Sequence, residues 1–261
     1  MAMDSEFRFR CHPGISCFNK CCSKLDIFLS PYDIVRMKNR LNMTSGEFLL
    51  KYTDTIIPKD VVLPFVKLNM GKDGRCQFNT DAGCTIYTDR PSVCRYYPLG
   101  LGLVTRKNVG GDFYFLIREE HCKGFEEDKQ WSVGQWRVDQ GPDLYDDMNK
   151  DWMDLVLKKK RIGAGYEPDE KSFRMFFMAC YDIDSFKSFV FESAFLDVFD
   201  LNEEEIHFIK TDEAELMKFA HRWLQFVLFK VPTMSLKKDA AKEKNAGDKG
   251  EGSSCGCSSC P

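Results

Sequence analysis

The spacing of apolar and polar residues changes character about half-way along the chain. From residue 132 onward, apolar side chains recur every three or four positions, as they do in helices that pack on a core. The pattern predicts helices over residues 142–161 and 168–181, one helix capped by Asp184, one capped by Asn202, and a longest helix from Thr211 to about Phe229. Pro232 is expected to end this helical region.

The first half of the chain shows the helical period only in two short stretches. Ser30-Pro31-Tyr-Asp33 predicts a helix start, because serine caps, proline suits the first position and aspartate faces the positive end of the dipole. A second capping box begins at Thr44. The other expected elements are an extended stretch over 61–70, a hairpin with arms 75–78 and 84–87, a short helix carrying Cys94, and a strand over 113–117.

These elements predict an α+β fold with most of the strands in the first half. The expected division is a cysteine-rich part over residues 1–125, a helical region over 126–232 that packs on it, and a disordered tail over 233–261. Within this tail, residues 235–254 contain almost no apolar side chain, so they lack the surface that a packed core requires.

Composition excludes some classes of partner. The 37 basic and 40 acidic residues give a net charge of −3, which argues against a general nucleic-acid binder with a basic face. No apolar run approaches the length that crosses a bilayer, and the N-terminus lacks the apolar segment of a signal peptide. The chain is therefore expected in the cytoplasm, with no membrane and no nucleic acid among its partners.

Cysteine is the residue that carries the candidate chemistry. Eight of the twelve cysteines lie within the first 122 residues. In a reducing compartment such crowded thiols are more typical of metal ligation than of disulfides. The predicted metal ligands are Cys11, Cys17, Cys21, Cys22, Cys76, Cys84, Cys94 and Cys122.

Spacing leaves the kind of metal centre open. Eight thiols suit two four-thiolate zinc sites, or one four-iron cluster with further thiols beside it. The adjacent Cys21 and Cys22 point opposite ways on an extended backbone, so they are able to serve different sites. Arg90 and Arg95 flank Cys94 and are predicted to offset the charge of an anionic centre. An all-thiolate set with paired arginines slightly favours an iron–sulfur cluster over zinc. His12 and His121 are reserve ligands, whereas the isolated Cys180 is expected in the core.

The chain closes with a second kind of thiol pattern, Cys255-x-Cys257-x2-Cys260, which suits a soft metal ion or thiol exchange. Elsewhere the sequence lacks a phosphate-binding loop, a dinucleotide fingerprint, a metalloprotease helix and a nucleophile elbow. An ordinary kinase, nicotinamide dehydrogenase or hydrolase is therefore not expected.

The cysteine-rich half resembles a known family. Phe9-Arg-Cys11, Cys17, Cys21-Cys22, Gly74-Arg-Cys76-Gln-Phe78, Gly83-Cys84-Thr-Ile-Tyr87 and Arg90-Pro91-x2-Cys94-Arg95-x-Tyr97-Pro98 occur in the order of the YkgJ-type cysteine-cluster (CxxxCxxCC) family. The resemblance covers about residues 7–125 and implies zinc or iron chelation. It extends more distantly to the flagellin lysine N-methylases, and this part implies a protein-modifying enzyme.

Three hypotheses follow from the sequence. The first is a metal-binding protein that holds an iron–sulfur cluster or zinc, with a structural, redox or sensing role. The second, which rests on the resemblance alone, is a cluster-dependent methyltransferase that uses S-adenosylmethionine on lysines of a protein substrate. The third is a zinc-stabilised module whose helices bind a protein partner.

Overall fold

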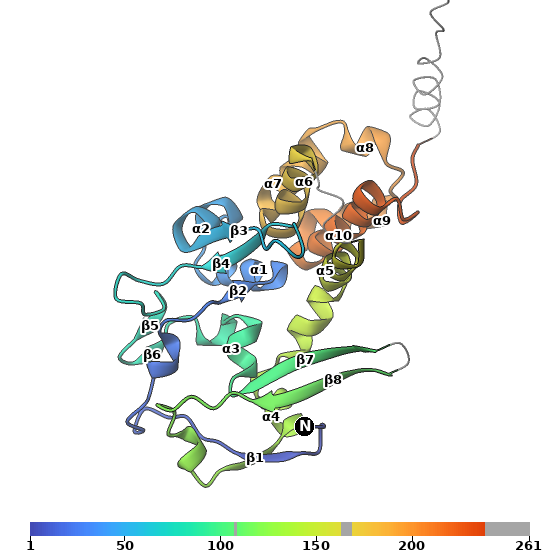
Figure 1. Cartoon of the computed structure of the whole chain (residues 1–261). Coiled ribbons are helices and arrows are strands. Elements are labelled where there is room, and N and C mark those ends of the chain that lie inside the picture. Colours follow the sequence, from blue (N-terminus) through green and yellow to red (C-terminus); the bar gives the residue numbers. More distant parts are fainter. Residues whose placement is uncertain (107–108, 163–168, 238–261) are drawn as a thin grey trace, which may run out of the picture.

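The computed structural model describes residues 1–106, 109–162 and 169–237 of the chain, and it has the mixed α+β architecture that the sequence predicts (Figure 1). The strands are β1 (Glu6–Arg8), β2 (Phe28–Leu29), β3 (Thr53–Ile56), β4 (Phe65–Leu68), β5 (Asn79–Thr80), β6 (Gly83–Cys84), β7 (Leu99–Arg106), β8 (Val109–Leu116) and β9 (Gln130–Ser132). The helices are α1 (Pro31–Arg40), α2 (Ser45–Tyr52), α3 (Ser92–Tyr96), α4 (Val133–Gln140), α5 (Asp143–Ile162), α6 (Glu170–Tyr181), α7 (Ile183–Glu192), α8 (Phe195–Val198), α9 (Glu203–Thr211) and α10 (Glu213–Phe229).

The strands form small antiparallel sheets. β1 pairs with β9, β5 with β6, and β7 with β8, while β4 lies between β2 and β3. The β1–β9 pairing joins residues more than 120 positions apart, since Glu6 lies opposite Ser132. The predicted hairpin exists, but it is tighter than expected. Asn79 pairs with Cys84 and Thr80 with Gly83, so Cys76 lies before the first strand instead of within it.

Local capping signals place several helices where the sequence predicts them. Ser30 and Thr44 each form a complete capping box, and Asn202 accepts a hydrogen bond from the amide of Glu205. The cap of α7 differs from the expectation, because Asp182 and not Asp184 accepts from the Ser185 amide. Among the described residues the longest helix is α5, with 20 residues, and α10 starts two residues later than predicted, with Asp212 as its cap.

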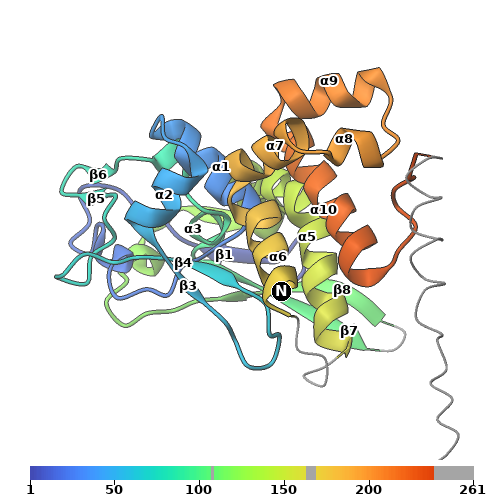
Figure 2. The same cartoon turned by 90° about the horizontal axis from the view of Figure 1, so that it is seen from above.

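Two apolar cores hold the elements together. The larger core packs α1, α2 and the β2–β4–β3 sheet against α5, α6, α7 and α10, which lie side by side in Figure 2. The smaller core includes Phe7, Phe9, Tyr114 and Trp136, and it packs β1 and the β7–β8 hairpin against α4. Cys180 is 2% exposed in the larger core, as its isolated position predicts.

The last described residues, 235–237, run beside residues 198–200. The Asp200 amide donates to the Ser235 carbonyl at 3.0 Å, and the Lys237 amide donates to the Val198 carbonyl at 3.0 Å. Ordered backbone therefore extends a few residues past Pro232. The predicted thiol pattern at Cys255, Cys257 and Cys260 lies outside the described residues.

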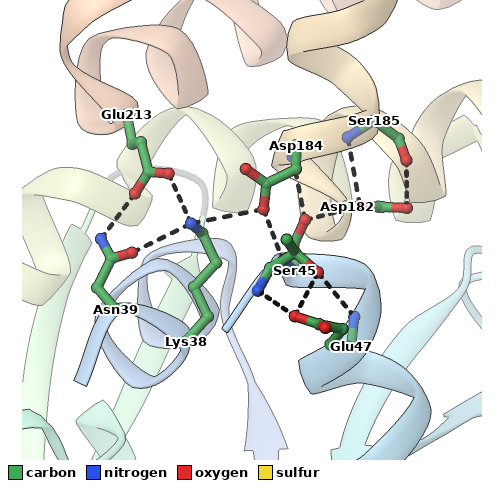
Figure 3. A network of polar contacts seen from close by, with 9 residues as sticks. Lys38, Asn39, Ser45, Glu47, Asp182, Asp184, Ser185 and Glu213 are labelled. Carbon is green, nitrogen blue, oxygen red and sulfur yellow. Dashed lines mark hydrogen bonds and ion pairs between the residues drawn. The ribbon is translucent and has the colours of Figure 1, made fainter. Parts of the chain in front are cut away.

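A polar junction joins α1 and α2 to the N-termini of α7 and α10 (Figure 3). The Lys38 side chain, 4% exposed, donates from Nζ to Glu213 Oε1 at 2.6 Å and lies 3.5 Å from Asp184 Oδ2. Ser45 donates its amide to Asp184 and its hydroxyl to Asp182, both at 2.6 Å. The junction fixes the helical region relative to the first two helices.

Candidate metal centre

Eight thiols of the cysteine-rich half are free in the structure, and most of them gather in two groups. We define the first thiol group as Cys11, Cys17, Cys21 and Cys122, and the second thiol group as Cys76, Cys84 and Cys94. The eighth thiol, Cys22, follows Cys21 in the short 3₁₀ helix Lys20–Cys22.

The first thiol group surrounds a small hollow. Its four side chains line this hollow together with Phe9, Arg10, Ile15, Tyr97, His121 and Gly124. The pKa of Cys11 is raised to about 11. Burial is the largest cause, and the negative charges that Cys21, Cys17 and Cys122 would carry as thiolates act in the same direction. These thiols are therefore close enough to interact electrostatically, which thiols scattered over the surface would not do.

Tight turns bring the first three cysteines of this group together. The amides of Ile15, Phe18 and Lys20 each bond to the carbonyl three residues earlier, so the loop coils back on itself. The pKa of Cys21 is raised, chiefly by its hydrogen bond with the Cys22 thiol and then by burial. Cys17 Sγ accepts a hydrogen bond from the Lys123 amide at 3.2 Å. This contact links the loop to the segment that carries Cys122.

Cys122 reaches the other three through long-range backbone pairing. The β1–β9 pairing brings the two segments together, and the Arg10 amide donates to the Gly124 carbonyl at 3.0 Å. A Cβ at Gly124 would lie 2.6 Å from the Phe9 ring, so only glycine permits this close approach. The position of Cys122 in the centre therefore depends on a contact that the cysteine spacing does not reveal.

A tyrosine completes the wall beside Cys122. The Tyr97 phenol donates to Glu119 Oε2 at 3.1 Å, and burial, followed by its hydrogen bond with Cys122, raises the pKa of Tyr97. Of the two reserve histidines, His121 lines the hollow, whereas His12 Nε2 lies 3.4 Å from Glu127 Oε2. No feature of the sequence singles out Tyr97, although it lies in the string that carries the resemblance.

The second thiol group is built by the β5–β6 hairpin and α3. Burial raises the pKa of Cys76 and that of Cys84, and nearby backbone amides, those of Phe78 and Asn79 for Cys76 and that of Ile86 for Cys84, act in the opposite direction. Burial raises the pKa of Cys94 to about 12, the neighbouring charges of Cys76, Asp33 and Cys84 act in the same direction, and Arg90 opposes them.

The two predicted arginines occupy different environments. Arg90 lies close enough to Cys84 and Cys94 for its charge to lower the pKa of both thiols, while it also donates to the Tyr87 carbonyl and to Gln140 Oε1. Arg95 is committed to the fold instead. Its guanidinium donates to the backbone carbonyls of residues 88, 90 and 140 and to the Tyr145 hydroxyl, and lies 4.3 Å from the centre of that ring.

The thiols of neither group are drawn together tightly in the structure. Among the described residues, no three His, Cys, Asp or Glu side chains form a set that would hold a single metal ion as they stand. Metal binding at either group therefore requires the sulfurs to move toward a shared ion or to surround a larger inorganic core.

Comparison with known proteins agrees with the chemistry of the thiols. Residues 10–128 match a family described as CxxCxxCC, a "putative zinc- or iron-chelating domain". Neither a curated protein nor a solved structure matches the chain. Within the part of the chain that the structure describes, no helix has the length and apolar character needed to cross a membrane.

Proposed function

We propose that this chain is a metal-binding protein whose principal centre is the first thiol group, and that this centre holds zinc or an iron–sulfur cluster. The observation that carries the proposal is the convergence of Cys11, Cys17, Cys21 and Cys122 on one hollow. The match of residues 10–128 to a zinc- or iron-chelating domain supports the same class of ligand.

The donor set fits soft or borderline metals. Four thiols provide the complete ligand shell of a structural zinc ion or of a four-iron cluster, and they suit neither magnesium nor calcium, which take oxygen ligands. The backbone amide that donates to Cys17 Sγ would stabilise a metal-bound thiolate, since such hydrogen bonds disperse its negative charge. Phe9, which is 2% exposed, and Tyr97 both line the hollow beside these thiols.

A bound metal would at least support the fold. The four thiols join the loop over 11–21 to the segment at 122, two parts of the chain that otherwise meet through a few backbone hydrogen bonds and the smaller core. Binding energy gained at this centre would be available to fix these segments. A redox or sensing role requires in addition that the centre be an iron–sulfur cluster.

The test is the iron, zinc and acid-labile sulfide content of protein purified without oxygen, together with its absorption spectrum. Iron with sulfide and a broad visible absorption would establish a cluster, and zinc without sulfide would establish a structural ion. The matched pair of variants is Cys17→Ala and Cys180→Ala, because both residues are buried but only Cys17 belongs to the centre. Equal metal content in the two variants would contradict the proposal.

The two other hypotheses stay predictions. No finding connects the chain to S-adenosylmethionine, and calorimetric titration of the metal-loaded protein with this compound would detect such an activity. A partner-binding role for the helices, and location in the cytoplasm, are likewise untested.

A further inference from the structure

The helical region carries an open groove between α9, α10 and the middle of α5, three helices that lie together in Figure 1. Its volume is about 520 Å³, and none of the predicted metal ligands lines it. Ile209 and Phe219 contribute buried apolar side chains to the lining, whereas Phe208, which also lines the groove, is 48% exposed. The groove therefore includes apolar surface that the described residues leave open.

Carboxylates outnumber cations around this groove. The lining has a net charge of −2, from the carboxylates of Asp151, Glu204, Glu205 and Glu215 and the cations of Lys218 and Arg222. Both cations are already matched, because Lys218 lies 2.8 Å from Glu215 and Arg222 pairs with Glu205. Asp151 acts on the charge of Lys218 only from beyond ion-pair distance, and within the described residues no ion pair reaches Asp151 or Glu204. Two unpaired carboxylates therefore lie beside the open apolar surface.

The described part of the chain ends close to this groove. The Thr233 hydroxyl donates to the carbonyl of Arg222, a lining residue, at 2.8 Å. The Lys237 amide then donates to the Val198 carbonyl at 3.0 Å, and Asn202, which also lines the groove, follows four positions after Val198. Four extended residues span at most about 14 Å, and paired strands lie about 5 Å apart. The chain therefore leaves the described structure within roughly 20 Å of the groove lining.

The residues at this point of the chain have the opposite charge to the groove. We define the basic segment as residues 237–244, Lys-Lys-Asp-Ala-Ala-Lys-Glu-Lys, whose four lysines and two acids give a net charge of +2. Residues 245–254 carry one lysine and two acids, a net charge of −1. The positive charge is therefore confined to the residues next to the groove. The seven residues after Lys237 span up to about 24 Å, which is enough to reach the lining.

We propose that the groove between α5, α9 and α10 is the docking site for the basic segment of the same chain. Its lysines pair with Asp151 and Glu204, and its two alanines cover part of Phe208. Exposed ion pairs of this kind contribute little to a complex of two separate molecules. Here the occupant is attached beside the groove, so its effective concentration is high and weak contacts are sufficient. Because the charges are exposed, salt should weaken the docking.

Docking would restrict the thiols near the end of the chain. Lys244 and Cys255 are 11 positions apart, which is at most roughly 40 Å of extended chain. Without docking, the restraint lies at Lys237, 18 positions before Cys255, and the limit rises to roughly 65 Å. Occupation of the groove would therefore keep Cys255, Cys257 and Cys260 closer to the helical region and shorten their reach toward other molecules.

The test is carbodiimide cross-linking of the full chain, which joins a lysine amine to a carboxylate in contact with it as an amide, with loss of water. An equal mixture of unlabelled and ¹⁵N-labelled chains is treated at low salt, and the links are mapped by mass spectrometry. We expect links from the basic segment to Asp151 or Glu204 within chains of one label, about fivefold more than from Lys249, the matched control outside the segment. These links should disappear at 1 M salt, whereas the contact between Lys218 and Glu215 supplies an internal positive control at low salt.

Two results of the mapping would overturn the proposal. Links between chains of different label would assign the groove to a second copy of the chain. Equal yields from the basic segment and from Lys249 would show that the segment has no preference for the groove.

A charge exchange tests whether charge holds the segment in place. Asp151→Lys with Glu204→Lys should abolish the links, as should Lys242→Glu with Lys244→Glu, and all four changes in one chain should restore links between the same positions. Asp151 and Glu204 are both exposed, so these substitutions leave the core intact. Absence of recovery in the chain with all four changes would refute the pairing of the basic segment with these two carboxylates.

Discussion

Lys38→Met should destabilise the fold by about 2 kcal/mol, because Lys38 is the only cation among the residues labelled in Figure 3. Breaking a fully buried ion pair costs about 3–5 kcal/mol. Here the ammonium is 4% exposed, but the side chains of Glu213 and Asp184 are 28% and 35% exposed, so water screens both carboxylates in the variant. Each carboxylate also keeps another donor, Asn39 Nδ2 for Glu213 and the Ser45 amide for Asp184, both at 2.6 Å.

The assay is urea unfolding followed by circular dichroism, with wild type and variants in the same metal-loaded state. A loss of about 2 kcal/mol corresponds to a fall in melting temperature of roughly 4–8 °C for a chain of this size. The matched control is Lys218→Met, whose ammonium lies 2.8 Å from Glu215 with both side chains more than 40% exposed. Its expected cost is below about 0.5 kcal/mol. Equal losses in Lys38→Met and Lys218→Met would refute the argument that burial makes the junction strong.

Three further predictions concern buried charge and the thiols. His221 is fully buried, and burial lowers its pKa from 6.5 to about 3, so the unfolded chain binds its proton first as the pH falls. The stability lost through this group between pH 7.5 and 5.5 should be about 1.4 kcal/mol, and urea unfolding of His221→Leu at both values should lack that component. Because burial raises the pKa of Cys11 to about 11 and that of Cys94 to about 12, zinc must displace protons. Competition titrations with a chelator should therefore show zinc affinity rising from pH 6.5 to 7.5, and a flat profile would contradict protonated thiols. Arg95→Gln should cost roughly 3 kcal/mol of stability and leave metal affinity unchanged, as unfolding and Co²⁺ titrations would show.

Elements defined by neighbouring residues could be predicted from the sequence. Ser30 and Thr44 cap helices because each has its acidic partner three positions later, and the whole motif lies within one turn. The predicted cap of α7, Asp184, was wrong because the choice is not made by neighbouring residues alone. Asp182 and Asp184 are both suitable caps in sequence, and the choice depends on Ser45, a residue from another helix that binds both.

Contacts between residues far apart in the chain explain which features of the candidate site could not be predicted from the sequence. The spacing of the cysteines indicates metal ligation, but it does not show that Cys122 joins Cys11, because this grouping depends on the pairing of β1 with β9. The roles of Arg90 and Arg95 are equally hidden. Both flank Cys94 in sequence, yet Arg95 turns toward Tyr145 on α5, a partner 50 positions away.

The two thiol groups differ in what the fold must provide before a metal arrives. The first group requires the long-range β1–β9 pairing and the close approach at Gly124, so its metal would fix a contact whose closure costs the unfolded chain much entropy. The second group is assembled mainly by a local hairpin and by a helix that Asp33 already holds. The first group is therefore the one whose occupation by a metal would change the order of the chain most.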